Sequence, residues 1–192
     1  HLSGALDRDA LKPLRLTGAA LGSFHPLQSV AVPITAPERL RGAYVGIEGD
    51  PLAVRASKRL AACLGMTPVM IPEGAKPAYH AAATFVSTYL VTMYDAAVEL
   101  AIGAGIDARL AKVMFLPLLE GTVGNLELLP AHIALTGAVR RGGVATLRAH
   151  LAALGPDDRR LYLELGRRAL RLASKMPIDP DRLAAMEKLL KA

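Results

Sequence analysis

The composition of the chain changes near residue 72, and this change limits the folds that it can adopt. Residues 1–72 hold short apolar runs interrupted by glycine and proline, whereas residues 73–192 are rich in alanine and leucine at helical spacing. Short apolar runs predict buried strands, and a helical period over longer segments predicts helices that pack against one another. The sequence therefore predicts an α/β part at 1–72 followed by an all-helical part at 73–192.

Three apolar runs in the first part are candidates for strands, at residues 18–24, 42–48 and 67–71. Between the second and the third, Asp50 and Pro51 form a helix start signal, and Gly65 follows the helical segment as a stop signal. A strand, a helix and a strand in this order are typical of a βαβ unit. We therefore expect residues 1–72 to form the edge of an α/β sheet.

The second part is expected to be helical almost throughout, with one long helix over 75–102 that ends at a glycine pair. Further helices are predicted at 107–119, with a kink at Pro117, and at 144–154, 157–174 and 181–190. The uncharged segment 81–94 is shorter than the ~20 apolar residues of a membrane span. We therefore expect a buried helix there and no membrane partner.

Composition narrows the possible functions. The net charge is +6, there is no tryptophan, and the single cysteine, Cys63, excludes an intramolecular disulfide or a cysteine-based zinc cluster. Cys63 is expected in the core, and no metal site is expected. Residues 140–175 hold nine Arg or Lys and three Asp or Glu. We interpret this excess as a solvated helix face; contact with phosphate is the alternative, but no nucleic-acid recognition motif accompanies it.

The segment 103–108 matches the G-x-G-x-x-G/A pattern of dinucleotide-binding loops. That pattern needs a strand before it, so that the pyrophosphate meets the N-terminus of the following helix. Here a long predicted helix precedes it. We therefore interpret Gly103 and Gly105 as a helix end and a turn.

Lys76 and His80 lie four residues apart at the start of the long predicted helix and so share one face. A helix N-terminus disfavours a nearby cation, which would favour the neutral forms of both groups and suit them to proton transfer. We expect both side chains to open onto one groove as catalytic residues. The alternative is a solvated Lys76 and a half-buried His80 without a catalytic role.

Further polar residues are candidates for lining a substrate or cofactor cleft. His25 and Gln28 follow a predicted strand, at the place where ligands bind in open α/β sheets. A turn is the simpler interpretation of His25 and Pro26. The segment with His1, Ser3 and Gly4 resembles the exit of another strand. Ser87 and Thr88 continue a polar stripe along the long helix.

Six segments, taken in order, resemble the Rossmann-like, DUF2520 domain-containing oxidoreductases, also described as F420-dependent NADP oxidoreductase-like. The segments are 1–6, 22–28, 46–50, 75–83, 121–126 and 135–137. The resemblance covers nearly the whole chain. It implies the C-terminal edge of a Rossmann-like dinucleotide-binding sheet at 1–72, followed by a helical domain at 73–192 like the C-terminal domain of 6-phosphogluconate dehydrogenase.

The resemblance also implies an NADP or NAD cofactor, a small-molecule substrate, a homodimer formed through the helical domain, and a cytoplasmic protein. A lysine near the start of the long helix is the acid or orienting group in relatives, and Lys76 matches it, with His80 beside it. Asn125 joins the cleft residues. Thr88 stands where the family often has asparagine, and Gly143 where it has aspartate. The family's glycine-rich cofactor loop would precede His1, and no residue of this sequence supplies it.

We therefore expect an NAD(P)-dependent oxidoreductase that transfers a hydride to or from a small carbonyl, hydroxy or imine substrate. Lys76 would polarise or protonate the reacting group, and His80 would assist. The alternative is a non-catalytic dimerisation or binding module on a dehydrogenase scaffold, which the departures at Thr88 and Gly143 favour.

Overall fold

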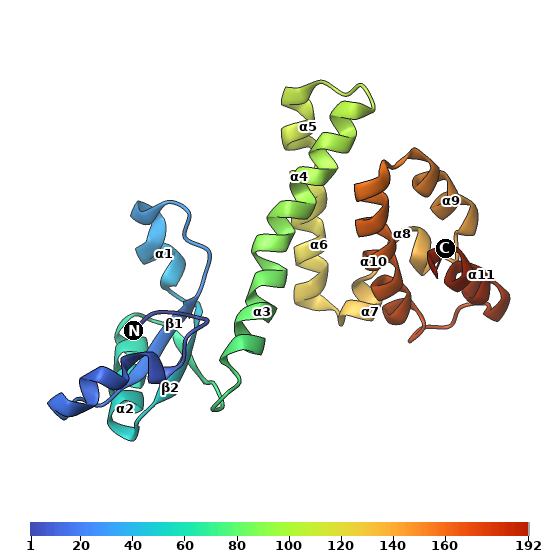
Figure 1. Ribbon diagram of the computed structural model, residues 1–192. Coiled ribbons are helices and arrows are strands. Elements are labelled where there is room, and N and C mark those ends of the chain that lie inside the picture. The colour runs from blue at the N-terminus through green and yellow to red at the C-terminus, as the bar shows by residue number, and fades with distance from the viewer. Residues whose placement is uncertain (192) are drawn as a thin grey trace. The chain divides into compact units, whose positions relative to one another are not determined.

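A computed structural model describes residues 1–191 of the chain. They form two compact units, the first over His1–Met93 and the second from Tyr94 to the C-terminal end. Composition divides the chain at residue 72, but the compact units divide inside a helix, after Met93. The first helix after the strands belongs to the first unit, where its Tyr79 reaches His25 of the sheet. Strands and the helix between them lie in the first unit, and the second is helical (Figure 1).

The first unit is built on a three-stranded sheet in the order β1-β2-β3. The strands are β1 (Gly22–Leu27), β2 (Tyr44–Gly49) and β3 (Thr67–Met70). β2 and β3 run parallel and are joined through helix α2 (Pro51–Cys63), which confirms the predicted βαβ unit, whereas β1 runs antiparallel to β2. β1 begins later than expected and continues through His25 and Pro26, so these residues lie within the strand and not in a turn.

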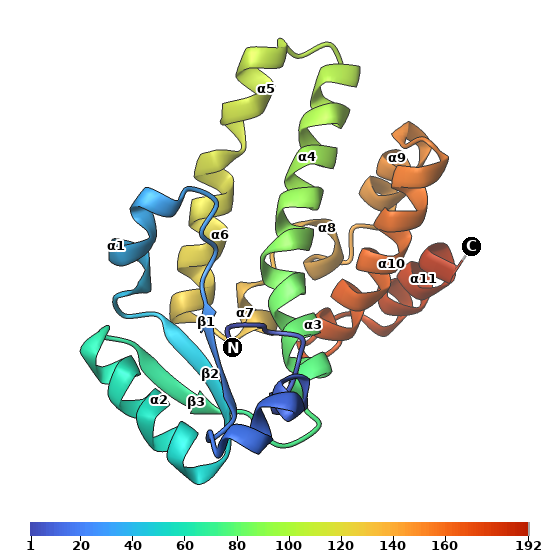
Figure 2. The same cartoon turned by 60° about the vertical axis from the view of Figure 1, so that its left-hand side comes forward.

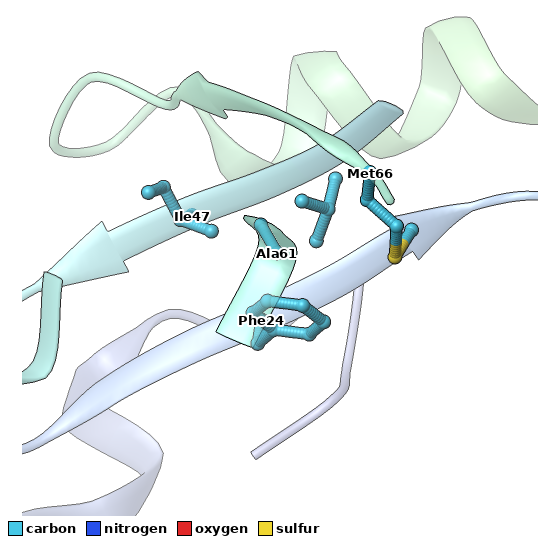
Figure 3. Close-up of a cluster of buried hydrophobic side chains, with 5 residues drawn as sticks. Phe24, Ile47, Ala61 and Met66 are labelled. Carbon is cyan, nitrogen blue, oxygen red and sulfur yellow. The ribbon is translucent and has the colours of Figure 1, made fainter. Parts of the chain in front are cut away.

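A small apolar core joins the sheet to α2. Phe24 and Ile47 are cross-strand partners on β1 and β2, and they pack with Val45, Ala61 and Met66 (Figure 3). Val45, Ile47 and Ala61 have no exposed surface. This core fixes the register of β1 on β2, and with it the position of His25 opposite Gly46.

Three short elements of the first unit are not predicted from the sequence: the 3-10 helices η1 (Arg8–Thr17) and η2 (Pro33–Thr35), and helix α1 (Ala36–Leu40). η1 is held to the sheet by ion pairs, because Asp50 lies within 3.5 Å of Arg8 and 4.0 Å of Arg15. Cys63, expected in the core, is exposed at the end of α2.

The expected long helix is two helices, α3 (Lys76–Val86) and α4 (Thr88–Gly103), which meet at Ser87. The expectation of a buried helix at 81–94 is wrong for this chain, since Phe85, Val86 and Val91 are 60%, 73% and 69% exposed. The stretch Lys76–Gly103 has the length and composition of a membrane-spanning helix, and 11% of its most apolar window is buried. Its two ends pack on protein, through Lys76 in the first unit and Val98 in the second.

The second unit contains α5 to α11, which follow α4. Their bounds are α5 (Ala108–Met114), α6 (Leu116–Leu128), α7 (Ala131–Ala134), α8 (Gly137–Arg140), α9 (Val144–Ala153), α10 (Pro156–Ala173) and α11 (Pro180–Lys191). α10 packs beside α11 (Figure 2). Their buried residues Leu170 and Leu190 join Leu147 of α9 in one core. The three predicted C-terminal helices are confirmed, but the expected helix 107–119 breaks at Phe115, two residues before Pro117.

The glycine pattern at 103–108 is a helix end, as expected. α4 ends at Gly103, Gly105 adopts a left-handed conformation with φ of 91°, and Asp107 caps α5 by accepting from the Arg109 and Leu110 amides. The Asp107 carboxylate therefore occupies the helix N-terminus at which a dinucleotide-binding pattern would hold a phosphate.

Gly49 should be the least replaceable glycine of the sheet. Its φ is 137°, and a Cβ at this position would lie 2.4 Å from the Leu21 carbonyl oxygen. We expect Gly49→Ala to lower the free energy of unfolding by about 3 kcal/mol or to prevent folding, because it combines backbone strain with a steric clash. Urea unfolding followed by circular dichroism measures the effect.

Gly42 is the matched control, since it has a φ of 81° and nothing within 4 Å of an added Cβ. Gly42→Ala should cost about 1 kcal/mol, the backbone strain alone. Equal losses in the two variants would contradict the assigned packing of Gly49 on Leu21.

Candidate active site

The candidate site lies within the first unit, where three segments meet: the end of β1, the first turns of α3, and the segment before η1. Pro77 occupies the first turn of α3, where backbone amides have no helical partners. The helix therefore starts at Lys76 and places Tyr79 and His80 one turn later. β1 contributes His25, whose register is fixed by the core.

A cavity of about 450 Å³ lies between the end of β1 and the face of α3 and α4. Its polar lining residues are His25, Gln28, Ser29, His80, Thr84, Ser87 and Thr88. The structure thus brings together five residues predicted separately as cleft or catalytic residues, and places Ser29 and Thr84 with them. The polar stripe of the long helix faces this cavity.

The two imidazoles of the cavity lie close together under the N-terminal segment. The ring centroids of His25 and His80 are 5.9 Å apart, with an angle of 64° between the rings. Gly4 is buried against both, and a Cβ there would lie 2.5 Å from His80 Cδ2 and 2.7 Å from His25 Nε2. Only a residue without a side chain allows this approach.

Lys76 does not open onto the cavity, contrary to the expected shared groove. The side chain is 1% exposed, and its Nζ donates a hydrogen bond to the Ser3 carbonyl oxygen at 2.9 Å. Burial lowers the pKa of Lys76, and the carboxylates of Glu48 and Asp7 oppose that shift. The shift has the expected direction for Lys76, but desolvation is its largest cause.

His25 is paired with a residue that sequence reasoning missed. Its Nδ1 lies 2.9 Å from the Tyr79 hydroxyl, within hydrogen-bond distance. Burial lowers the pKa of His25, and the charges of Lys76 and His80 lower it further. Burial raises the pKa of Tyr79, and the neighbouring Gly46 backbone partly offsets that shift.

Gly46 is the sequence feature that could have indicated the approach of Tyr79 to the sheet. A Cβ on Gly46 would lie 2.7 Å from the Tyr79 hydroxyl oxygen, so this strand residue leaves room for the phenol. A glycine inside a predicted strand indicates a close approach of another group. The sequence could not show which group approaches.

The other predicted residues have structural contacts. The His1 Nδ1 accepts a hydrogen bond from the Ser3 amide, which helps to shape the segment over the histidines. The Gln28 side-chain amide donates a hydrogen bond to the Arg39 carbonyl oxygen, so this donor is used in a contact with α1. Asn125 is exposed on α6 in the second unit, and its role in the same cleft stays a prediction.

Comparisons with known proteins agree with this architecture. A family model described as a domain of unknown function, DUF2520, matches residues 43–169. No curated protein matches the chain.

The solved structures that are similar to the chain include the following three. Protein TM1727 from Thermotoga maritima is 25% identical, with a TM-score of 0.76 over 91% of this chain and 68% of that one. The protein named putative NADP oxidoreductase BF3122 from Bacteroides fragilis is 22% identical, with a TM-score of 0.69 over 88% and 63%. Plasmodium falciparum pyrroline carboxylate reductase, solved with NADP bound, is 14% identical, with a TM-score of 0.53 over 98% and 68%.

The described residues do not fit the pyrophosphate group of a dinucleotide. Two strand-to-helix junctions could offer a phosphate-binding helix N-terminus, and each carries a carboxylate, Asp50 before α2 and Glu73 before α3. Both carboxylates pair with Arg8, at 3.5 Å and 3.4 Å. A phosphate there would meet negative charge. The imidazole and hydroxyl groups of the cavity instead fit a small polar molecule.

The pKa of His25 offers a test of this electrostatic arrangement. We expect NMR titration to give a value below the ordinary 6.5, and Lys76→Met to raise it, because one repelling charge is removed. The value should still stay below 6.5, since burial is the larger cause. Lys58→Met, at an exposed position on α2, is the control and should leave it unchanged.

The lowered pKa of His25 also determines the direction in which stability changes with pH. The unfolded chain binds this proton at a higher pH than the folded chain does, so the contribution of His25 to stability is lost as the pH falls below about 6.5. A His25 that titrates at or above its ordinary value would contradict the arrangement.

Proposed function

Because the chain belongs to the DUF2520 family, whose structural relatives share its α/β-then-helical fold, we propose that it forms the substrate-binding side of an NAD(P)-dependent oxidoreductase. The observation that carries the proposal is the cavity in which His25 and His80 meet beneath Gly4. Two of the similar structures are named for NADP chemistry or contain NADP. NADP or NAD, when bound, would supply or accept the hydride.

The lining of the cavity favours a small substrate that presents oxygen atoms. Its polar groups are imidazoles, hydroxyls and one amide, and no carboxylate is among the residues that line it. A carbonyl, hydroxy or imine compound, neutral or anionic, would find hydrogen-bond partners there. A free amine would find no counter-ion.

We assign the proton-transfer role to His80. Its imidazole lines the cavity, and imidazole gains and loses a proton near neutral pH, which suits a general acid or base. Lys76 acts through the Ser3 carbonyl oxygen instead, because its buried ammonium holds the segment that carries Gly4. In this proposal Lys76 is a positioning residue. The proposed hydride transfer would take place in the cytoplasm.

The test uses the natural protein that contains this sequence, with reduced NADP or NAD and a set of 2-oxo acids and cyclic imines. We expect loss of the reduced-nicotinamide absorbance with at least one of them. His80→Gln should lower kcat by about 10²–10⁴-fold, the usual contribution of a general acid or base.

His150→Gln is the matched control, because His150 also pairs with a tyrosine but lies in the second unit. It should leave kcat unchanged. If neither cofactor binds at millimolar concentration, the chain is instead a binding module on a dehydrogenase scaffold.

We further propose that the chain forms a homodimer through its helical part. Helix α6 is largely apolar, yet it contains no buried residue within the chain. Leu118 and Leu128 are 68% and 82% exposed, and Leu126 is 53% exposed. Apolar surface of this kind on a helix marks an interaction site, and a second copy of the same helix offers a matching face.

Sedimentation velocity tests the dimer. Leu118→Glu should convert a dimer to a monomer, since it places a charge within the apolar face. Leu16→Glu is the control, because Leu16 is 97% exposed on η1 in the first unit. A wild-type protein that sediments as a monomer at micromolar concentration would overturn this proposal.

A further inference from the structure

We infer that Tyr79 is a positioning residue that holds His25 as its Nε2–H tautomer, so that His25 offers a fixed hydrogen-bond donor to a substrate oxygen. The part about the substrate rests on the proposed function. The part about the tautomer rests on contacts within the first unit alone.

The first step concerns Nδ1 of His25, which lies 2.9 Å from the Tyr79 hydroxyl. One of the two groups must donate the shared hydrogen. Among residues 1–191, the Tyr79 hydroxyl has no hydrogen-bond partner other than His25. The phenol hydrogen then needs an acceptor, and His25 Nδ1 is the acceptor within reach. Tyr79 therefore donates, and Nδ1 carries no hydrogen.

The second step concerns Nε2, which must carry the hydrogen of the neutral ring. No hydrogen bond to Nε2 is present among residues 1–191, and no buried side-chain nitrogen or oxygen in that part of the chain lacks a partner. Nε2 is therefore accessible. It lies beside Gly4, on a ring that lines the cavity.

The third step concerns charge. His25 faces Lys76, whose Nζ is also 5.9 Å from the centre of the Tyr79 ring, and it faces His80 from the same helix. These neighbours disfavour a second proton on the ring, since His25 would then be a cation near a buried ammonium. His25 is thus a neutral donor, and proton transfer is left to His80.

The consequence is a preference among ligands. A neutral Nε2–H can donate to a carbonyl or carboxylate oxygen but cannot accept from an amine or a protonated imine. The geometry points to a substrate whose oxygen, and not its nitrogen, lies against His25. Gly4 keeps that position open, because a side chain there would occupy the space beside Nε2.

Long-range ¹H–¹⁵N correlation spectra of the ¹⁵N-labelled chain at neutral pH distinguish the two tautomers. His25→Gln identifies the His25 signals by their loss. We expect the nitrogen shifts of the Nε2–H form, with Nδ1 as the bare nitrogen. Tyr79→Phe removes the donor, so the His25 shifts should move toward a mixture of tautomers.

Tyr162→Phe is the matched control, because Tyr162 makes the corresponding 2.7 Å contact with His150 in the second unit. It should shift the His150 signals and leave those of His25 unchanged. A wild-type His25 in the Nδ1–H or charged form would overturn the inference without any variant, as would a Tyr79→Phe spectrum that is folded and unchanged. The measurement needs no ligand. Absence of oxidoreductase activity would therefore not contradict the tautomer, and a different tautomer would not contradict the proposed oxidoreductase function.

Discussion

The buried ammonium of Lys76 is the interaction on which the candidate site depends. A cation at 1% exposure is costly unless it is hydrogen-bonded, and here the Ser3 carbonyl oxygen supplies the bond while Glu48 and Asp7 supply negative charge nearby. This contact ties the segment before η1 to the first turn of α3. Backbone hydrogen bonds between His1 and the Gly22 and Phe24 backbone of β1 hold the other end of the segment.

The same burial sets the electrostatics of the cavity. Lys76, His25 and His80 are three groups that could each carry a positive charge within a small volume. Because the lysine is held beneath the segment, its charge acts on His25 through a short distance and a poorly solvated region. Protonation of His25 is therefore disfavoured, whereas the His80 side chain lines the cavity.

Local sequence signals predicted much of the fold. The βαβ unit, the end of α4 at Gly103 and the three C-terminal helices follow from apolar period, proline and glycine, which act through the backbone of the residues that carry them. The errors lie where tertiary contacts decide. The continuation of β1 through Pro26 depends on its pairing with β2, and the exposure of 81–94 reflects how little of the chain packs against that segment.

For the candidate site, the sequence by itself determined which residue types are present and that Lys76 and His80 share a helix face, since helical spacing fixes that relation. It also placed His25 near the end of a strand. Only the tertiary structure decided that Lys76 is buried under Ser3, that His80 faces the cavity, and that Tyr79 bonds to His25. The physical reason is that these contacts join residues up to 73 positions apart, and no local period or propensity specifies such a pairing.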